Sequence, residues 1–163
     1  MKIYNNTNML IVNIKKCILL PVLGFWGLAF ICAQTHVEME NLLESQAITY
    51  AQAARFSLEA SETAVISDTE EAFRFALERK WLPAGASPDS PARLDGISLL
   101  LMSSFNIKGG ILYSIFQNPH YAYRELIYLN IIQGRTDPHM AVSGSQLLSM
   151  ISRTLTVLER DNT

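Results

Sequence analysis

Apolar residues recur at intervals of three and four through most of the chain after residue 45, which is the spacing of one helix face. No segment alternates apolar and polar residues with a period of two, so a β-sheet is not expected. The pattern therefore predicts an all-α chain, with helices at residues 47–62, 69–80, 94–105, 121–130 and 144–158 and a short apolar turn or helix at 111–116.

Residues that favour helix ends border these segments. Thr49 can accept a hydrogen bond from a backbone amide of the helix that follows, Ser67-Asp68 can cap the next helix, and a cap near Asp95 is expected for the third helix. Residues Asn106–Gly110 are expected to close that helix, with Gly109 and Gly110 free to take a left-handed conformation. Between residues 81 and 93 three prolines predict a rigid extended loop: Pro83, Pro88 and Pro91.

The chain also repeats itself faintly at a spacing of fifty residues. Ala72-Phe73-Arg74 returns as Ala122-Tyr123-Arg124, and Ser87-Pro88 returns as Asp137-Pro138. A period of this length is typical of stacked supersecondary units, which usually form binding surfaces. The alternative is two similar helical hairpins without a true repeat. The same register relates Leu82 to Ile132, Ile97 to Leu147, Leu100 to Met150 and Leu101 to Ile151.

The N-terminus has the order of an export signal. Lys15-Lys16 precedes the uncharged apolar run Cys17–Ala33, and polar Gln34 follows. Three outcomes are open: cleavage after Ala33, lipidation of Cys32, or retention as an uncleaved membrane anchor. Each of them places the rest of the chain outside the cytoplasm, in the periplasm or cell envelope. The expected organisation is a signal or anchor at 1–33, an acidic leader at 34–44 and a helical domain at 45–163.

Composition narrows the class of protein further. With 49% hydrophobic and 17% charged residues, the 163-residue chain is not disordered by composition. The formal charge is −2 and no basic stripe is present, so nucleic acid is not an expected partner. Both cysteines, Cys17 and Cys32, lie in the signal segment, so thiol chemistry is excluded from the exported part.

Residues 120–143 resemble an S-layer homology (SLH) repeat. The matching stretches are His120–Leu126, then Leu129–Gly134, then Asp137-Pro138 and Val142-Ser143. A weaker second copy is similar at residues 70–105, and residues 48–60 resemble the end of a first copy. The resemblance implies a tandem of helix–loop–helix repeats, with a partial copy at 45–66 and copies at 67–110 and 111–160.

The SLH resemblance also implies a function. The family anchors exported proteins to cell-wall polysaccharide, and the arginine of its Thr-Arg-Ala-Glu motif grips an acidic sugar substituent. Here Tyr50 and Gly144 stand at that arginine position in the outer copies, and only Arg93 lies near it in the middle copy. The candidate ligand-binding residues are Arg93, Trp81, Tyr121, Tyr123 and Arg124. The aromatic members of this set can stack on sugars or pack in a core.

Catalytic and metal-binding chemistry is not expected. Asp137 and His139 form only a pair of candidate ligands with His120 nearby in sequence, and a loop cap by Asp137 explains the aspartate better. Ser143-Gly144-Ser145 lacks the preceding strand of a hydrolase nucleophile. We therefore expect no cofactor, no metal and no enzymatic activity. Two functions remain: a module that binds cell-wall polymer or an envelope protein, or a small lipoprotein or anchored scaffold that acts through protein contacts only.

Overall fold

The computed structural model describes residue 37 and residues 39–134 and 136–161. The chain divides into two compact units, Met1–Asn41 and Leu42–Thr163. In the first unit the described residues, 37 and 39–41, are helical. The predicted signal or anchor at 1–33 and the lipidation candidate Cys32 lie outside the described residues. Within the described ranges, no helix is both long and apolar enough to span a bilayer.

The second unit is all-α, as predicted. The part of the chain that the structure describes contains no strand, and only two isolated β-bridges pair Thr49 with Pro91 and Arg93 with Ala141. The expected helices are all present, although several begin or end two to three residues from the predicted limits. They are α2 (Tyr50–Ala60), α3 (Thr69–Glu78), α4 (Leu94–Ser104), α5 (Ile111–Phe116), α6 (Pro119–Tyr128) and α7 (Gly144–Asp161).

Local side-chain chemistry starts most of these helices. The Thr49 hydroxyl accepts from the Gln52 amide while the Gln52 side chain accepts from the Thr49 amide, which is a capping box. Asp68 accepts from the amides of Glu70 and Glu71, and Asn118 accepts from that of Tyr121.

The limits of α4 agree with the prediction within one residue, but the residues at its two caps differ from the expected ones. The cap residue of α4 is Arg93 rather than Asp95, and no side chain caps this helix. At its other end the left-handed residue is Asn106, with φ 49°, and not Gly109 or Gly110. An asparagine can adopt this conformation because its short polar side chain bonds locally.

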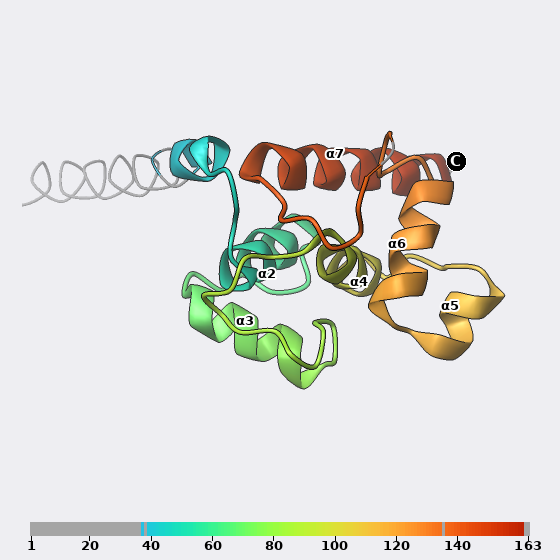
Figure 1. Cartoon of the computed structure of the whole chain (residues 1–163), viewed down its shortest axis with the longest axis horizontal. Helices are drawn as coiled ribbons and strands as arrows, with labels where there is room; N and C mark the ends of the chain where they lie inside the picture. Colours follow the sequence, from blue (N-terminus) through green and yellow to red (C-terminus); the bar gives the residue numbers. More distant parts are fainter. Residues whose placement is uncertain (1–36, 38, 135, 162–163) are drawn as a thin grey trace, which may run out of the picture. The chain divides into compact units, whose positions relative to one another are not determined.

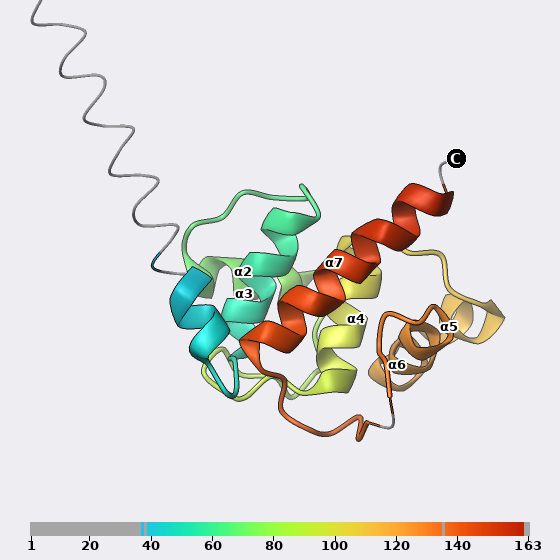
Figure 2. The ribbon, with the colours of Figure 1, turned by 90° about the horizontal axis from the view of Figure 1, so that it is seen from above.

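Helix α4 is the centre of the second unit. It packs against α2, α6 and α7, while α3 covers α2 and α5 lies against α6 (Figures 1 and 2). Its sequence explains this place, because ten of its eleven residues are buried and an all-round apolar helix must be covered on every side. In α3 and α6 only one face is buried.

Residues fifty apart have matching environments. Ala72 and Ala122 are both fully buried, and Leu82 and Ile132 are both buried after the ends of α3 and α6. Phe73 and Tyr123 are buried on the same helical faces, whereas Arg74 and Arg124 are both exposed. The loops 81–93 and 131–143 that follow the two helices have the same length.

Three buried loop residues form a closed ring of backbone hydrogen bonds, which we call the loop ring: Ile48, Ala92 and Val142. The amide of Ile48 donates to the Val142 carbonyl (2.9 Å), that of Val142 to the Ala92 carbonyl (3.0 Å), and that of Ala92 to the Ile48 carbonyl (2.7 Å). All three residues are fully buried. The residue after each of them stands at the start of α2, α4 or α7, so the loop ring brings three helix starts together.

A substitution at Gly144, the first residue of α7, tests how closely the chain packs at the start of this helix. A Cβ added here would lie 1.7 Å from the backbone carbonyl oxygen of Leu42, and backbone cannot move aside as a side chain can. We expect Gly144→Ala to lower the free energy of unfolding by about 2 kcal/mol or more, because overpacking forces the backbone to shift. Urea unfolding of residues 34–163, monitored by far-UV circular dichroism, measures the change.

Gly85→Ala is the matched control. No atom lies within 4 Å of a Cβ added at Gly85, so this substitution should change stability by less than about 0.5 kcal/mol. Equal effects of the two substitutions would contradict the close approach of Leu42 to α7.

Candidate functional site

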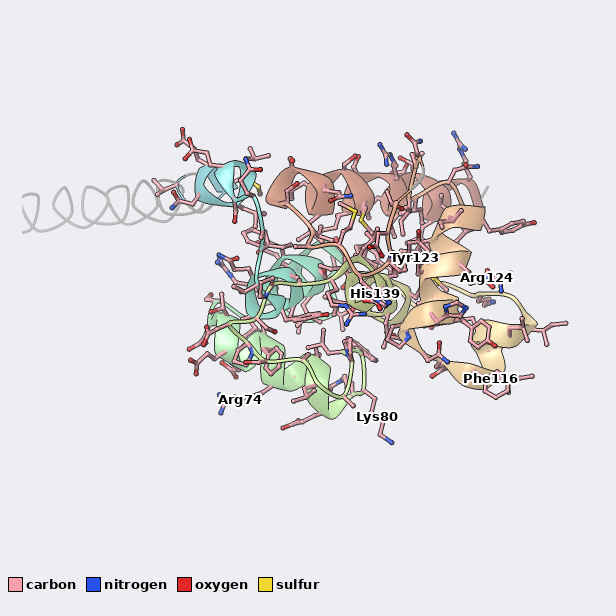
Figure 3. All side chains as sticks on the ribbon, viewed as in Figure 1. Arg74, Lys80, Phe116, Tyr123, Arg124 and His139 are labelled. Carbon is pink, nitrogen blue, oxygen red and sulfur yellow. The ribbon has the colours of Figure 1, made fainter. Side chains whose placement is uncertain are left out.

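A polar cluster lies beside the loop ring and consists of Arg93, Asp95 and His139, the last of which is labelled in Figure 3. The guanidinium Nη2 of Arg93 donates to Oδ2 of Asp95 at 2.7 Å and also contacts Nδ1 of His139. His139 Nδ1 lies 3.3 Å from the same carboxylate oxygen. Oδ1 of Asp95 accepts from the Gly96 amide at 2.8 Å, so both carboxylate oxygens are engaged.

Burial differs sharply within this cluster. The side chain of Asp95 is 11% exposed, whereas those of Arg93 and His139 are 47% and 66% exposed. The carboxylate is therefore a covered support, and the two nitrogen-bearing groups are presented to solvent. A buried, fully bonded carboxylate restricts the geometry of its partner, which is how a protein orients a charged binding group in advance.

A pocket of about 450 Å³ opens next to Arg93 and Asp95, and we call it the Arg93 pocket. Its volume lies in the range of small-molecule sites. The remaining walls come from α2, the proline loop and the start of α6: Tyr50, Pro83, Gly85, Ala86, Ser90, Pro91 and Pro119. The pocket thus combines flat apolar walls with one guanidinium, one carboxylate and two hydroxyl groups.

Tyr50 couples the pocket to the start of α4. Its ring is buried, and its hydroxyl oxygen accepts from the Arg93 amide at 3.3 Å. Gly96 leaves room for it, since a Cβ there would lie 2.4 Å from that hydroxyl. Burial raises the pKa of the Tyr50 hydroxyl and the Asp95 charge adds to the rise, while the Arg93 amide and guanidinium oppose it.

The other candidate residues lie elsewhere. Trp81 meets Phe75 edge-on with ring centroids 6.0 Å apart, and the Arg79 guanidinium lies over both rings. Tyr123 is buried, and its hydroxyl donates to the Thr136 carbonyl at 2.7 Å, which ties α6 to the following loop.

Tyr121 and Arg124 are brought together, but away from Arg93. They line a separate pocket of about 370 Å³ between α5 and α6, where Tyr121 stacks on Phe116 with ring centroids 5.8 Å apart. The five predicted ligand-binding residues are therefore distributed over several places, and only Arg93 lines the pocket beside the loop ring.

The residues considered for catalysis or metal binding make structural contacts. Asp137 accepts from the His139 amide at 2.9 Å, which is the loop cap expected from the sequence. The Ser143 hydroxyl accepts from the Gln146 amide at the start of α7. His120 lies edge-on to Tyr121. Among the described residues, no three His, Cys, Asp or Glu side chains are arranged to hold a metal ion.

Sequence reasoning missed Asp95 and His139 as members of the Arg93 cluster. Asp95 lies two residues after Arg93, and this short spacing could have indicated an ion pair between them. His139 is 46 residues from Arg93, and only the pairing of two loops brings it close.

Comparison of the chain with models of protein families, with curated proteins and with solved structures finds no match.

The raised pKa of Tyr50 predicts a dependence of stability on alkaline pH. The folded state keeps this proton to higher pH than the unfolded state, whose tyrosine pKa is near 10. The stabilisation from Tyr50 is thus complete below about pH 10 and is lost as the pH rises through the higher folded-state pKa. We expect Tyr50→Phe to flatten the fall in unfolding free energy above about pH 10 relative to the unaltered protein.

Urea unfolding of residues 34–163 over a pH series, at constant ionic strength, measures both curves. At neutral pH the variant should be less stable by about 1 kcal/mol, because the Arg93 amide loses its acceptor. Curves that stay parallel into the alkaline range would contradict the burial of this hydroxyl.

Proposed function

We propose that this chain is an exported, non-enzymatic protein of the cell envelope, and that its helical domain is a divergent SLH-like tandem that binds an acidic cell-wall polymer in the Arg93 pocket. The residue pattern of the copies at 67–110 and 111–160 supports this reading. So do the matching environments of residues fifty apart and the similar helix starts that meet at the loop ring.

The observation that carries the proposal is the identity of the three residues that follow the loop ring. Thr49 and Ser143 cap α2 and α7 with their hydroxyl groups. Arg93, at the corresponding position of α4, makes no side-chain cap. Giving up such a cap costs about 1 kcal/mol, so the guanidinium is present at the expense of helix stability. Departures from local preference of this kind are expected at functional sites.

The geometry of the pocket suits an anionic sugar. Within the described part of the chain, the guanidinium contacts of Arg93 use Nη2, which leaves donors on Nη1 and Nε for a carboxylate or a similar substituent. The exposed imidazole of His139 adds a second nitrogen beside the guanidinium. The hydroxyls of Ser90 and Tyr50 and the proline walls supply the polar and apolar contacts that a sugar ring uses.

A second candidate function is a scaffold that acts through protein contacts only, with the N-terminal segment as its membrane attachment. The exposed apolar side chains of α5 favour it, because contiguous apolar surface marks interaction sites. Such a scaffold would not need the Arg93 pocket. The two functions therefore differ in whether the domain binds cell-wall polymer when no protein partner is present.

Sedimentation of purified residues 34–163 with protein-free cell-wall sacculi tests the proposal. We expect the unaltered domain to sediment with the polymer, and Arg93→Ala to weaken binding about 10- to 100-fold, since charge-assisted hydrogen bonds contribute about 1.5–3 kcal/mol. Trp81→Ala should bind as the unaltered domain does, because this ring lies outside the pocket.

Arg74→Ala is the matched control, since it removes the same charge from an exposed position on α3 (Figure 3). Equal weakening by Arg74→Ala and Arg93→Ala would indicate nonspecific attraction to the polymer and contradict the assigned site. Failure of the unaltered domain to sediment at low salt would reject polymer binding and favour the scaffold.

A further inference from the structure

The second unit contains two helix pairs, α2 with α3 and α4 with α6, which we call its first and second halves. Helix α5 is an insertion in the second half. The segment that joins α2 to α3 has eight residues, 61–68, whereas the segment that joins α4 to α6 has fourteen, 105–118. The difference of six residues is the length of α5 itself. The packing of α6 on α4 and that of α3 on α2 are otherwise similar, so α5 is not needed to join the helices.

One buried side chain holds α5 in place. Tyr113 is buried, and its ring packs close to Gly109 and Met102. Gly109 allows this approach, because a Cβ there would lie 2.6 Å from the Tyr113 ring and 3.0 Å from Met102. The orientation of α5 is therefore set by packing, and so are the directions of its other side chains.

The side chains that α5 turns outward are apolar. Ile111 is 80% exposed, Ile115 64%, Phe116 53% and Leu112 48%. Tyr128, which lines the pocket between α5 and α6, is 81% exposed. We call these five residues the α5 patch. In the equivalent segment 61–68, Val65 is the one large apolar residue that is exposed.

The segment that carries α5, residues 96–124, is basic, although the chain as a whole is acidic. Residues 96–124 contain no aspartate or glutamate. Lys108 precedes α5 in the sequence, Arg124 lines the pocket with Leu112 and Tyr128, and His120 lies beside Tyr121. One carboxylate, that of Glu125, lines the same pocket as Leu112 and Tyr128 and lies against Gly110. In contrast, the equivalent segment 61–68 carries Glu62 and Asp68 and no cation.

We propose that the α5 patch inserts into the interface of a lipid bilayer that contains anionic headgroups. Apolar side chains on one short element, with tyrosine and cations at the rim, are the composition of an interfacial anchor. Lys108 and Arg124 complement the negative headgroups. The five residues of the patch are enough for an interfacial anchor, whereas a protein partner would have to cover more of the surface, because a stable interface uses about 20–30 residues on each side. This inference does not depend on the Arg93 pocket.

Matched probes on the full-length chain test the insertion, with Cys17→Ser and Cys32→Ser removing the native thiols. A polarity-sensitive fluorophore is attached at Ser114→Cys on α5 or at Ser67→Cys in the equivalent segment, where both serines are exposed. Vesicles are either zwitterionic or a mixture of zwitterionic and anionic phospholipid. We expect a blue shift at position 114 with the mixed vesicles, a smaller one with zwitterionic vesicles, and none at position 67.

Two variants sharpen the result. Ile115→Asp with Phe116→Asp should abolish the shift at position 114, whereas Val65→Asp should leave it unchanged. Lys108→Glu with Arg124→Glu should remove the preference for anionic vesicles. Because the N-terminal segment is the same in every sample, attachment through it alone cannot produce a difference between positions 114 and 67.

The proposal would be overturned by equal shifts at the two positions, by no shift at position 114, or by a shift that appears without vesicles as protein concentration rises. The last result would mean that a second copy covers the patch. Loss of sacculus binding in Arg93→Ala has no bearing on this readout.

Discussion

The architecture depends on the three backbone hydrogen bonds of the loop ring. Ile48, Ala92 and Val142 are fully buried, and an unpaired backbone group at such a site would cost about 1–3 kcal/mol. Each of the three donates to a different loop and accepts from the remaining one. Because every bond joins residues at least 44 positions apart, the ring forms only when α2, α4 and α7 are all in place, so it couples the helices into one cooperative unit.

The loop ring also explains why the candidate site lies where it does. It brings loop 131–143 against the start of α4, and this contact places His139 beside Arg93 and Asp95. The neighbouring starts of α2 and α7 carry hydroxyl caps, and among the described residues neither has a comparable cluster of charged side chains. A scaffold with similar helix starts can therefore acquire a charged site by changing one cap residue, while the other two keep their caps and the stability that these supply.

Features that arise within a few residues could be predicted from the sequence. The helical periodicity, the Thr49 and Asp68 caps and the Asp137 turn each involve neighbours in the chain, and the structure confirms them. The cap expected near Asp95 is Arg93, and Asp95 itself caps nothing at this helix start, because its carboxylate bonds the Arg93 guanidinium instead. Similarly, Trp81 and Tyr123 look alike as candidate sugar-binding aromatics until packing shows one in a cation–π cluster and the other bonded to Thr136.

Both proposed surfaces lie where the correspondence between the two halves breaks. Arg93 replaces a hydroxyl cap, and α5 extends a segment that is six residues shorter in the other half. Lengthening a surface loop is inexpensive in chain entropy, since doubling its length costs only about 0.6 kcal/mol. The low entropy cost of a longer loop does not explain why α5 exposes several large apolar side chains. An insertion made of polar residues would have the same entropy cost. The burial of Tyr113 adds to this argument: a helix fixed by packing while it presents Ile111 and Ile115 to solvent has an orientation that matters.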